Sequence, residues 1–275
     1  MTIDGVVRIA AISDIHYSKT SQGSLQPLFA QITESADVLV IAGDLTDYGL
    51  AEEARVLVKD LTASLKIPAV GVLGNHDFET GEEKEIMKIL QDAGVRMLDG
   101  DTCEVHGIGF AGVRGFCGGF GRGALGAWGE SVIKAFVHET INEALKLEAA
   151  LARLETEHRI AVLHYAPIRE TVEGEPLEIY PFLGSSRLEE PLSRYEVTAV
   201  FHGHAHKGAL EGVTSKGIPV YNVSLPLLRE HQKDQPPFRI LELRTGEVRS
   251  TEQDQIAERR RAGRRSEDRA SAAGG

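Results

Sequence analysis

Short apolar runs that end in small polar or histidine residues recur along this chain and constrain its fold more than any other feature. In the first 77 residues they occupy Val6 to Ile12, Asp37 to Ala42 and Pro68 to Leu73. Their lengths and β-branched residues predict buried strands. Leu25 to Ser35 and Leu50 to Leu65, which lie between them, have the length and apolar spacing of helices. Two successive β-α-β units predict a parallel sheet flanked by helices.

The remainder of the chain extends this α/β pattern. Thr102 to Val113 has the pattern of a hairpin that turns near Gly107, and the glycine-rich stretch 107–126 predicts an irregular loop. A helix is expected at Glu82 to Ala93, and a long helix or a pair of helices at Ser131 to Glu157. Strands are expected at Arg159 to Leu163, Val197 to Phe201, Pro219 to Val223 and Phe238 to Leu243. The apolar pattern stops near Ser250. We therefore predict one domain over residues 1–249 and a charged, flexible tail over 250–275.

The charge balance narrows the choice of partners. The chain has 41 acidic and 30 basic residues, a formal net charge of −11. A surface this acidic repels a nucleic-acid backbone, so nucleic-acid binding by the domain is not expected. Arginines in the predicted tail leave such a contact open for that segment alone. The sequence carries no signal for the oligomeric state.

Targeting and cofactor signals are weak. The first residues lack the basic start and long apolar stretch of a signal peptide, and no apolar run of roughly 18 residues predicts a membrane span. With only two cysteines, Cys103 and Cys117, we expect a cytoplasmic protein with reduced thiols. Gly107 to Gly112 matches the dinucleotide-binding fingerprint by letters, but no helix pattern follows. No nucleotide cofactor is therefore predicted.

Seven polar side chains follow the carboxyl ends of predicted strands. They are Asp14, His16, Asp44, Asn75, His164, His204 and His206. Loops that leave adjacent strand ends converge at one edge of an open α/β sheet, where ligands bind. No lysine or arginine is among these donors, so a cation is needed to hold them together. Imidazole, carboxylate and amide without thiolate suit Mn, Fe, Zn or Co better than Ca.

Each of these residues also has an ordinary structural interpretation. Taken alone, Asp14 could cap a helix, Asn75 could lie in a turn, and any one histidine could be a hydrogen-bonded core residue. The set as a whole favours a metal site. On an extended segment His204 and His206 point the same way, and Gly203 lets the backbone bend close to an ion.

The segments that carry these residues resemble, in order and spacing, the five sequence blocks of calcineurin-like metallophosphoesterases. The blocks are Asp14-Ile15-His16, Gly43-Asp44-Leu45-Thr46-Asp47, Gly74-Asn75-His76-Asp77, His164 and Gly203-His204-Ala205-His206. The resemblance covers nearly all of the chain before the predicted tail. It implies a four-layer α-β-β-α sandwich of two facing mixed sheets, with the site between their upper edges.

The resemblance also implies a role for each residue. Asp14, His16, Asp44 and His206 would hold one metal ion, and Asp44, Asn75, His164 and His204 would hold a second, so that Asp44 bridges the two. Mn, Fe and Zn are the leading candidates. Two such ions would supply a hydroxide at neutral pH and clamp the phosphoryl oxygens.

Further residues of the site follow from the same resemblance. His76 is not a ligand in the family scheme but faces the leaving group, where it would donate a proton or stabilise charge. Asp47 would orient His76, with Asp77 as the other candidate; the structural alternative for Asp47 is a helix cap. His202 matches no family position, so we expect a buried, hydrogen-bonded histidine there.

The block details indicate a substrate class. Protein Ser/Thr phosphatases of this family carry an arginine where this chain has Tyr48, so Tyr48 disfavours protein phosphatase activity. Asp77 and the Gly-His-Ala-His block resemble bacterial class III cyclic-nucleotide phosphodiesterases. We predict a phosphodiesterase acting on small phosphate esters, with cyclic nucleotides as leading substrates and phosphomonoesters as further ones. The alternatives are an inactive scaffold with this fold, a nuclease and a phospholipid-headgroup hydrolase.

Overall fold

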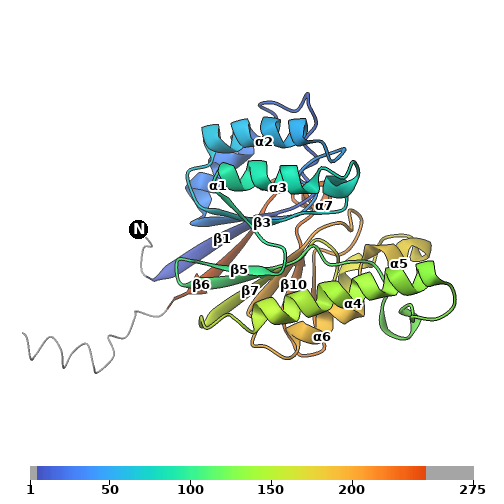
Figure 1. Ribbon diagram of the computed structural model, residues 1–275. Helices are drawn as coiled ribbons and strands as arrows, with labels where there is room; N and C mark the ends of the chain where they lie inside the picture. Colours follow the sequence, from blue (N-terminus) through green and yellow to red (C-terminus); the bar gives the residue numbers. More distant parts are fainter. Residues whose placement is uncertain (1–4, 246–275) are drawn as a thin grey trace, which may run out of the picture.

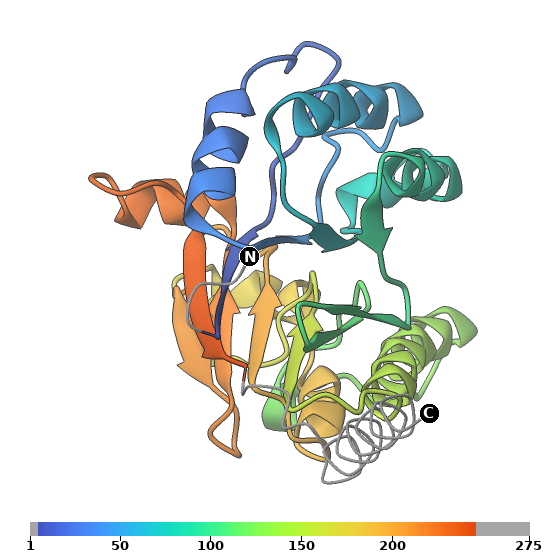
Figure 2. The ribbon, with the colours of Figure 1, turned by 90° about the vertical axis from the view of Figure 1, so that its left-hand side faces the viewer.

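The computed structural model describes residues 5–245, which form two facing sheets with helices on both outer sides. Three helices cover the first sheet and two cover the second (Figure 1): α1 (Gln26–Ser35), α2 (Ala51–Ser64) and α3 (Glu83–Asp92), then α4 (Ser131–Leu151) and α6 (Glu189–Leu192). In Figure 2 the blue and teal helices lie above the sheets and the green helix α4 lies below them. This layering confirms the predicted four-layer sandwich. The predicted tail at 250–275 lies outside the described residues.

The first sheet contains both predicted β-α-β units. Its strand order is β11-β1-β2-β3-β4, with bounds β1 (Val6–Ile12), β2 (Val38–Ala42), β3 (Ala69–Val72), β4 (Val95–Met97) and β11 (Arg239–Arg244). Strands β1, β2, β3 and β4 are parallel to one another, and β11 runs antiparallel to β1. The three-residue strand β4 was not predicted, because so short a run has no readable periodicity.

The second sheet has the order β5-β6-β7-β8-β10-β9. Its strands are β5 (Asp101–Val105), β6 (Ile108–Gly112), β7 (His158–Val162), β8 (Ala199–His202), β9 (Glu211–Val213) and β10 (Pro219–Asn222). The four central strands are parallel, and the edge strands β5 and β9 are antiparallel to their neighbours. The β5–β6 hairpin turns at His106 and Gly107, both with positive φ, as a two-residue type I′ turn requires.

Three apolar layers hold the sheets and helices together. Val40, Phe110 and Phe201 belong to the layer between the two sheets. Phe29 belongs to the layer beneath α1, α2 and α3, and Leu147 to the layer beneath α4. Because both sheets are covered on both faces, their central strands are apolar throughout rather than alternating. That is why these strands can be recognised in the sequence.

Several connecting elements differ from the prediction. Helix α4 ends at Leu151, short of Glu157, and three short helices were not expected: α5 (Tyr180–Leu183), α6 and α7 (Leu225–His231). The irregular loop begins only after β6, and the single-turn 3₁₀ helix η2 (Gly121–Gly123) lies within it. Within residues 5–245, no helix is both long and apolar enough to cross a membrane.

Candidate metal centre

The seven predicted donors lie just beyond the carboxyl ends of five parallel strands. Asp14 and His16 follow β1, Asp44 follows β2, Asn75 follows β3, His164 follows β7, and His204 and His206 follow β8. These strands come from both sheets. The fold therefore brings together side chains that are up to 192 positions apart in the chain.

Six of the seven donors form two compact groups. One group consists of Asp14, His16 and His206, and the other of Asp44, His164 and His204; within each, one potential ligand atom per residue lies within 4.8 Å of the others. The seventh donor, Asn75, adjoins the second group, because its Oδ1 lies 2.9 Å from His164 Nε2. The family resemblance implies that the first group also includes Asp44 and the second also includes Asn75; that assignment of ligands stays a prediction.

Asp44 lies between the two groups. Its Oδ1 is 3.3 Å from His164 Nε2, and its Oδ2 is 3.9 Å from His16 Nε2. Each carboxylate oxygen therefore faces a different imidazole. A carboxylate in this position can contribute one oxygen to each of two cations.

The donor set fits bound cations. Both ring nitrogens of His16 are buried and have no hydrogen-bond partner among residues 5–245. An unpartnered buried imidazole is costly unless a ligand completes it. Nitrogen and carboxylate donors without thiolate suit divalent first-row metals.

Backbone strain is concentrated at the same residues. Four of the seven donors have the left-handed φ that non-glycine residues rarely adopt: Asp14 (56°), His16 (43°), Asp44 (50°) and His204 (68°). Such conformations persist only where surrounding contacts enforce them, and they cluster at functional sites.

Glycines allow the close approach of the donor loops. A Cβ on Gly74 would lie 2.2 Å from Asp44 Oδ1, and one on Gly203 would lie 1.9 Å from Ser13 Oγ and 2.3 Å from Asp14 Oδ2. A Cβ on Gly43 would meet the ring of His164 at 2.4 Å. The glycines that precede Asp44, Asn75 and His204 are therefore steric requirements of the site.

Main-chain carbonyls orient two of the imidazoles. His164 Nδ1 donates to the carbonyl oxygen of Ala42 (2.9 Å), which leaves Nε2 facing Asp44 and Asn75. His204 Nε2 lies 3.1 Å from the carbonyl oxygen of Phe182, which leaves Nδ1 for a ligand. Hydrogen bonds of this kind fix the tautomer of metal-binding histidines. Sequence reasoning missed Ala42 and Phe182, because a main-chain carbonyl carries no residue-type signal.

The acidic and imidazole groups shift one another's pKa values. Burial lowers the pKa of His204 to about 4. Burial also acts to lower the pKa of His164, but the charge of Asp44 and a hydrogen bond to it outweigh burial and raise that pKa to about 9. Burial opposes the charge of Asp14, yet the hydrogen bond to His206 and the charge of His164 hold the pKa of Asp14 well below its usual range. The site thus concentrates ionised carboxylates that attract a cation.

The groups that orient His76 differ from those that the sequence predicted. Its Nδ1 donates to the main-chain carbonyl of Asp47 (2.7 Å) and lies 3.1 Å from Glu79 Oε1. The carboxylate of Asp47 instead has its Oδ1 3.7 Å from His16 Nδ1. The predicted contact between Asp47 and His76 therefore exists, but it is made by the main chain rather than by the carboxylate. Sequence reasoning did not identify Glu79.

Asp77 and His202 are buried, and hydrogen bonds within the protein hold both side chains. Asp77, the other candidate to orient His76, is buried, and its carboxylate accepts hydrogen bonds from Thr46 and the Gly74 N–H rather than from the His76 ring. His202 is fully buried, with Nε2 2.8 Å from Thr171 Oγ1 and Nδ1 donating to the Gly203 carbonyl. The expectation of a buried, hydrogen-bonded histidine at position 202 is confirmed.

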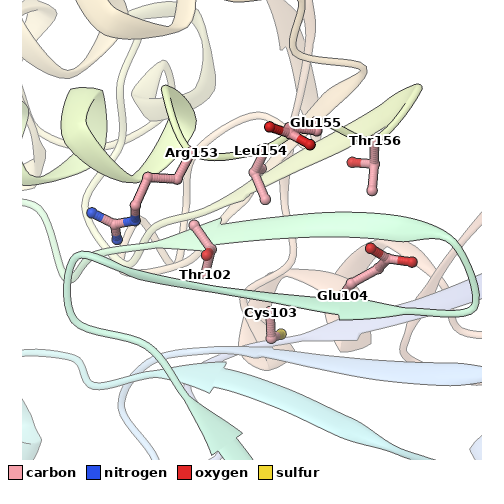
Figure 3. Close-up of a pocket in the computed structure, with 7 residues that line it drawn as sticks. All are labelled: Thr102, Cys103, Glu104, Arg153, Leu154, Glu155 and Thr156. Atoms are coloured by element: carbon pink, nitrogen blue, oxygen red, sulfur yellow. The ribbon is translucent and has the colours of Figure 1, made fainter.

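Two hollows elsewhere on the surface contain none of the donors. One of about 450 Å³ lies between β5 and the turn that joins α4 to β7 (Figure 3), lined by Thr102, Cys103, Glu104, Arg153, Leu154, Glu155 and Thr156. The other, of about 490 Å³, adjoins the amino ends of α2 and α3 and is lined by Lys19, Leu50, Ala51, Glu52, Arg55, Glu82 and Glu85. Neither contains convergent groups comparable to those at the strand ends.

Comparison with known proteins identifies the family. The family model described as calcineurin-like phosphoesterase matches residues 7–208. The chain belongs to the calcineurin-like phosphoesterase family. This phosphoesterase is accordingly a hydrolase, and its two donor groups are candidate metal-binding sites of a metal-dependent enzyme. No curated protein sequence matches it significantly.

Two solved structures are similar to the phosphoesterase at low sequence identity. The protein TT1561 of Thermus thermophilus is 16% identical, with a TM-score of 0.50 over 80% of this chain and 89% of that chain. A Staphylococcus aureus protein described as a "Putative 5'-Nucleotidase", in complex with alpha-ketoglutarate, is 15% identical, with a TM-score of 0.49 over 79% of this chain and 48% of that chain. At 16% identity the likeness to TT1561 concerns the fold alone.

Proposed function

We propose that this phosphoesterase hydrolyses phosphodiester bonds of small molecules with two bound metal ions, with cyclic nucleotides as leading substrates and phosphomonoesters as further ones. The observation that carries the proposal is the position of Asp44. Its two carboxylate oxygens face separate donor groups, one containing His16 and the other His164. A single carboxylate shared in this way suits a binuclear centre better than two independent ions.

The proposal gives each donor a role. Asp14, His16, Asp44 and His206 hold the first ion, and Asp44, Asn75, His164 and His204 hold the second. When bound, such a pair of ions activates water as the nucleophile and neutralises charge on the phosphoryl oxygens. Mn, Fe and Zn are the proposed metals, since their chemistry suits imidazole and carboxylate donors.

His76 serves the leaving group in this proposal. Because its Nδ1 donates to the carbonyl of Asp47, the ring is fixed and Nε2 is the nitrogen left for the substrate. From there it donates a proton to the departing oxygen or stabilises the charge that develops on it. Its ring centroid lies 4.6 Å from that of His16, which places it beside the first donor group.

Tyr48 supports a small phosphodiester over a phosphoprotein as substrate. It directly follows Asp47, and 59% of its surface is exposed. A tyrosine offers no positive charge for the dianionic phosphate of a phosphoserine.

The cytoplasmic location expected from the sequence stays a prediction.

A substrate screen on metal-reconstituted protein tests the proposal. We expect turnover of bis(p-nitrophenyl) phosphate and cyclic AMP after addition of Mn²⁺, and large losses in His76→Ala and Asp44→Asn. Asp101→Asn, an exposed change on β5, serves as the matched control and retains activity. Inertness toward both diesters alongside turnover of p-nitrophenyl phosphate would remove the diesterase assignment.

Metal stoichiometry separates the enzyme from an inactive scaffold. The enzyme should bind two ions per chain and lose at least one in Asp44→Asn. A scaffold would bind fewer than one ion and be indifferent to that change. All seven donors and His76 are present, which favours the enzyme.

A further inference from the structure

One aromatic side chain close to His76 is exposed yet held in place. Phe78 ends the 3₁₀ helix η1 (His76–Phe78), and 36% of its surface is exposed. The guanidinium carbon of Arg114 lies 4.3 Å from the centre of its ring, a cation–π distance. Arg114 thus covers part of the ring, and another part remains open to solvent.

Arg114 is itself firmly anchored in the other half of the molecule. It follows β6 of the second sheet, its side chain is only 15% exposed, and its Nη2 lies 2.9 Å from Glu139 Oε1 on α4. Its main-chain carbonyl accepts hydrogen bonds from the N–H groups of His164 (2.9 Å) and Tyr165 (3.1 Å). The contact between Phe78 and Arg114 therefore joins the loop carrying His76 to the loop carrying His164.

We propose that Phe78, backed by Arg114, is a specificity-determining residue that stacks against a planar aromatic group attached to the leaving oxygen. The substrate class is then a nucleotide or aryl phosphodiester rather than an alkyl one. This inference rests on the proposed function, in which His76 faces the leaving group. The ring of Phe78 packs against Arg114, whose main-chain carbonyl accepts from the N–H of His164, so the ring lies where the loops carrying His76 and His164 meet and can contact a group attached to the leaving oxygen.

The physical basis is the stacking of flat π-systems. A protein binds a nucleotide more tightly when the base stacks on an exposed aromatic ring, and every nucleobase has a flat face that can stack in this way. A ring already immobilised by Arg114 loses little further rotamer freedom when the base binds.

Product inhibition of the metal-reconstituted full chain provides the test. AMP and ribose 5-phosphate differ only in the base, so the ratio of their inhibition constants isolates its contribution. We expect AMP to inhibit about tenfold more strongly than ribose 5-phosphate does. Phe78→Ala should bring the ratio of the two inhibition constants close to one, and Phe78→Trp should retain the ratio of the parent protein. Leu145→Ala, which removes an exposed apolar side chain from α4, is the control and should leave the ratio unchanged. A ratio near one in the parent protein, or an unchanged ratio in Phe78→Ala, would overturn the inference.

A binding measurement separates this inference from the proposed function. The fluorescence of 2-aminopurine riboside 5′-monophosphate is quenched when its base stacks on an aromatic ring. This measurement of binding does not require the enzyme to turn over a substrate. Quenching by the parent chain but not by Phe78→Ala, in a protein that cleaves no ester, would retain the stacking site and reject the function. Turnover of alkyl and nucleotide diesters with equal KM, and no quenching, would reject the stacking site alone.

Discussion

The carboxylate of Asp77 accepts two hydrogen bonds from Thr46, one from the main-chain N–H at 2.8 Å and one from the hydroxyl at 2.6 Å. Its other oxygen accepts from the N–H groups of Gly74 (2.8 Å) and Leu45 (3.2 Å). One fully buried side chain thus joins the loop after β2, which carries Asp44, to the loop after β3. The relative position of the two loops depends on these bonds.

Replacing Asp77 with Asn should destabilise the protein. Both carboxylate oxygens accept from N–H groups, so the amide of an asparagine would place a donor against donors. We expect a loss of about 1–3 kcal/mol in the free energy of unfolding at pH 7. Urea titration followed by circular dichroism measures it. Asp101→Asn, a change at an exposed residue at the start of β5, should change stability by less than about 0.5 kcal/mol. Equal stability of the two variants would show that the Asp77 bonds are dispensable.

Gly203→Ala should disrupt the site by steric conflict. The added Cβ would lie 1.9 Å from Ser13 Oγ and 2.3 Å from Asp14 Oδ2, so the loop after β1 or the loop after β8 must move. We expect reduced binding of Mn²⁺ and a lower melting temperature. Gly123→Ala is the matched control, because its Cβ would meet no atom within 4 Å. Full Mn²⁺ binding by Gly203→Ala would contradict the steric argument.

The strands and the clustering of the donor residues could be predicted from sequence because both have strong local signals. Runs such as Val38–Ala42 are buried on both faces of their sheet, so their apolar character is continuous. Polar residues directly after such runs must lie at the sheet edge, which is why Asp44 and His164 could be expected to converge.

The remaining features depend on information that the local sequence does not contain. The edge strand β9 (Glu211–Val213) has three residues and no buried face, so no pattern marks it. The expectation that the Asp47 carboxylate orients His76 differs from the structure because rotamers and loop direction decide which atom makes the contact. Phe182 contributes through its carbonyl oxygen, whose position depends on the unpredicted helix α5.

Addition of Mn²⁺ should raise the melting temperature of metal-free protein. A ligand present at 100 times its dissociation constant stabilises a protein by about 2.7 kcal/mol. For a chain of this size that corresponds to roughly 5–10 °C, because each kcal/mol shifts the midpoint by about 2–4 °C. Differential scanning fluorimetry measures the shift. Asp44→Asn should lose most of it and Asp101→Asn none; a shift retained in Asp44→Asn would place the bound ions elsewhere.

Asp37→Asn should have an effect that depends on pH. Burial opposes the charge of Asp37, but hydrogen bonds from the side chain (3.2 Å) and N–H (2.9 Å) of Arg8 outweigh it and hold the pKa below its ordinary value. A carboxyl with a lowered folded-state pKa stabilises above its unfolded pKa, and this contribution is lost as pH falls through the folded value. We expect Asp37→Asn to lower the free energy of unfolding by about 1 kcal/mol at pH 7 and by less at pH 3. Urea unfolding at the two pH values measures the difference. The same cost at both pH values would show that the charge contributes nothing.

Glu79→Gln should impair hydrolysis of esters with poor leaving groups more than those with good ones. Glu79 Oε1 lies 3.1 Å from His76 Nδ1, and glutamine keeps an acceptor there while removing the charge. Because the pair is partly exposed, the expected loss is modest, about threefold in kcat for cyclic AMP. Bis(p-nitrophenyl) phosphate, whose leaving group needs little help from His76, should lose much less. Glu83→Gln, a change at a half-buried glutamate in the first turn of α3, is the control and should alter neither rate. Equal losses on both substrates in Glu79→Gln would indicate a general structural effect instead of a contribution through His76.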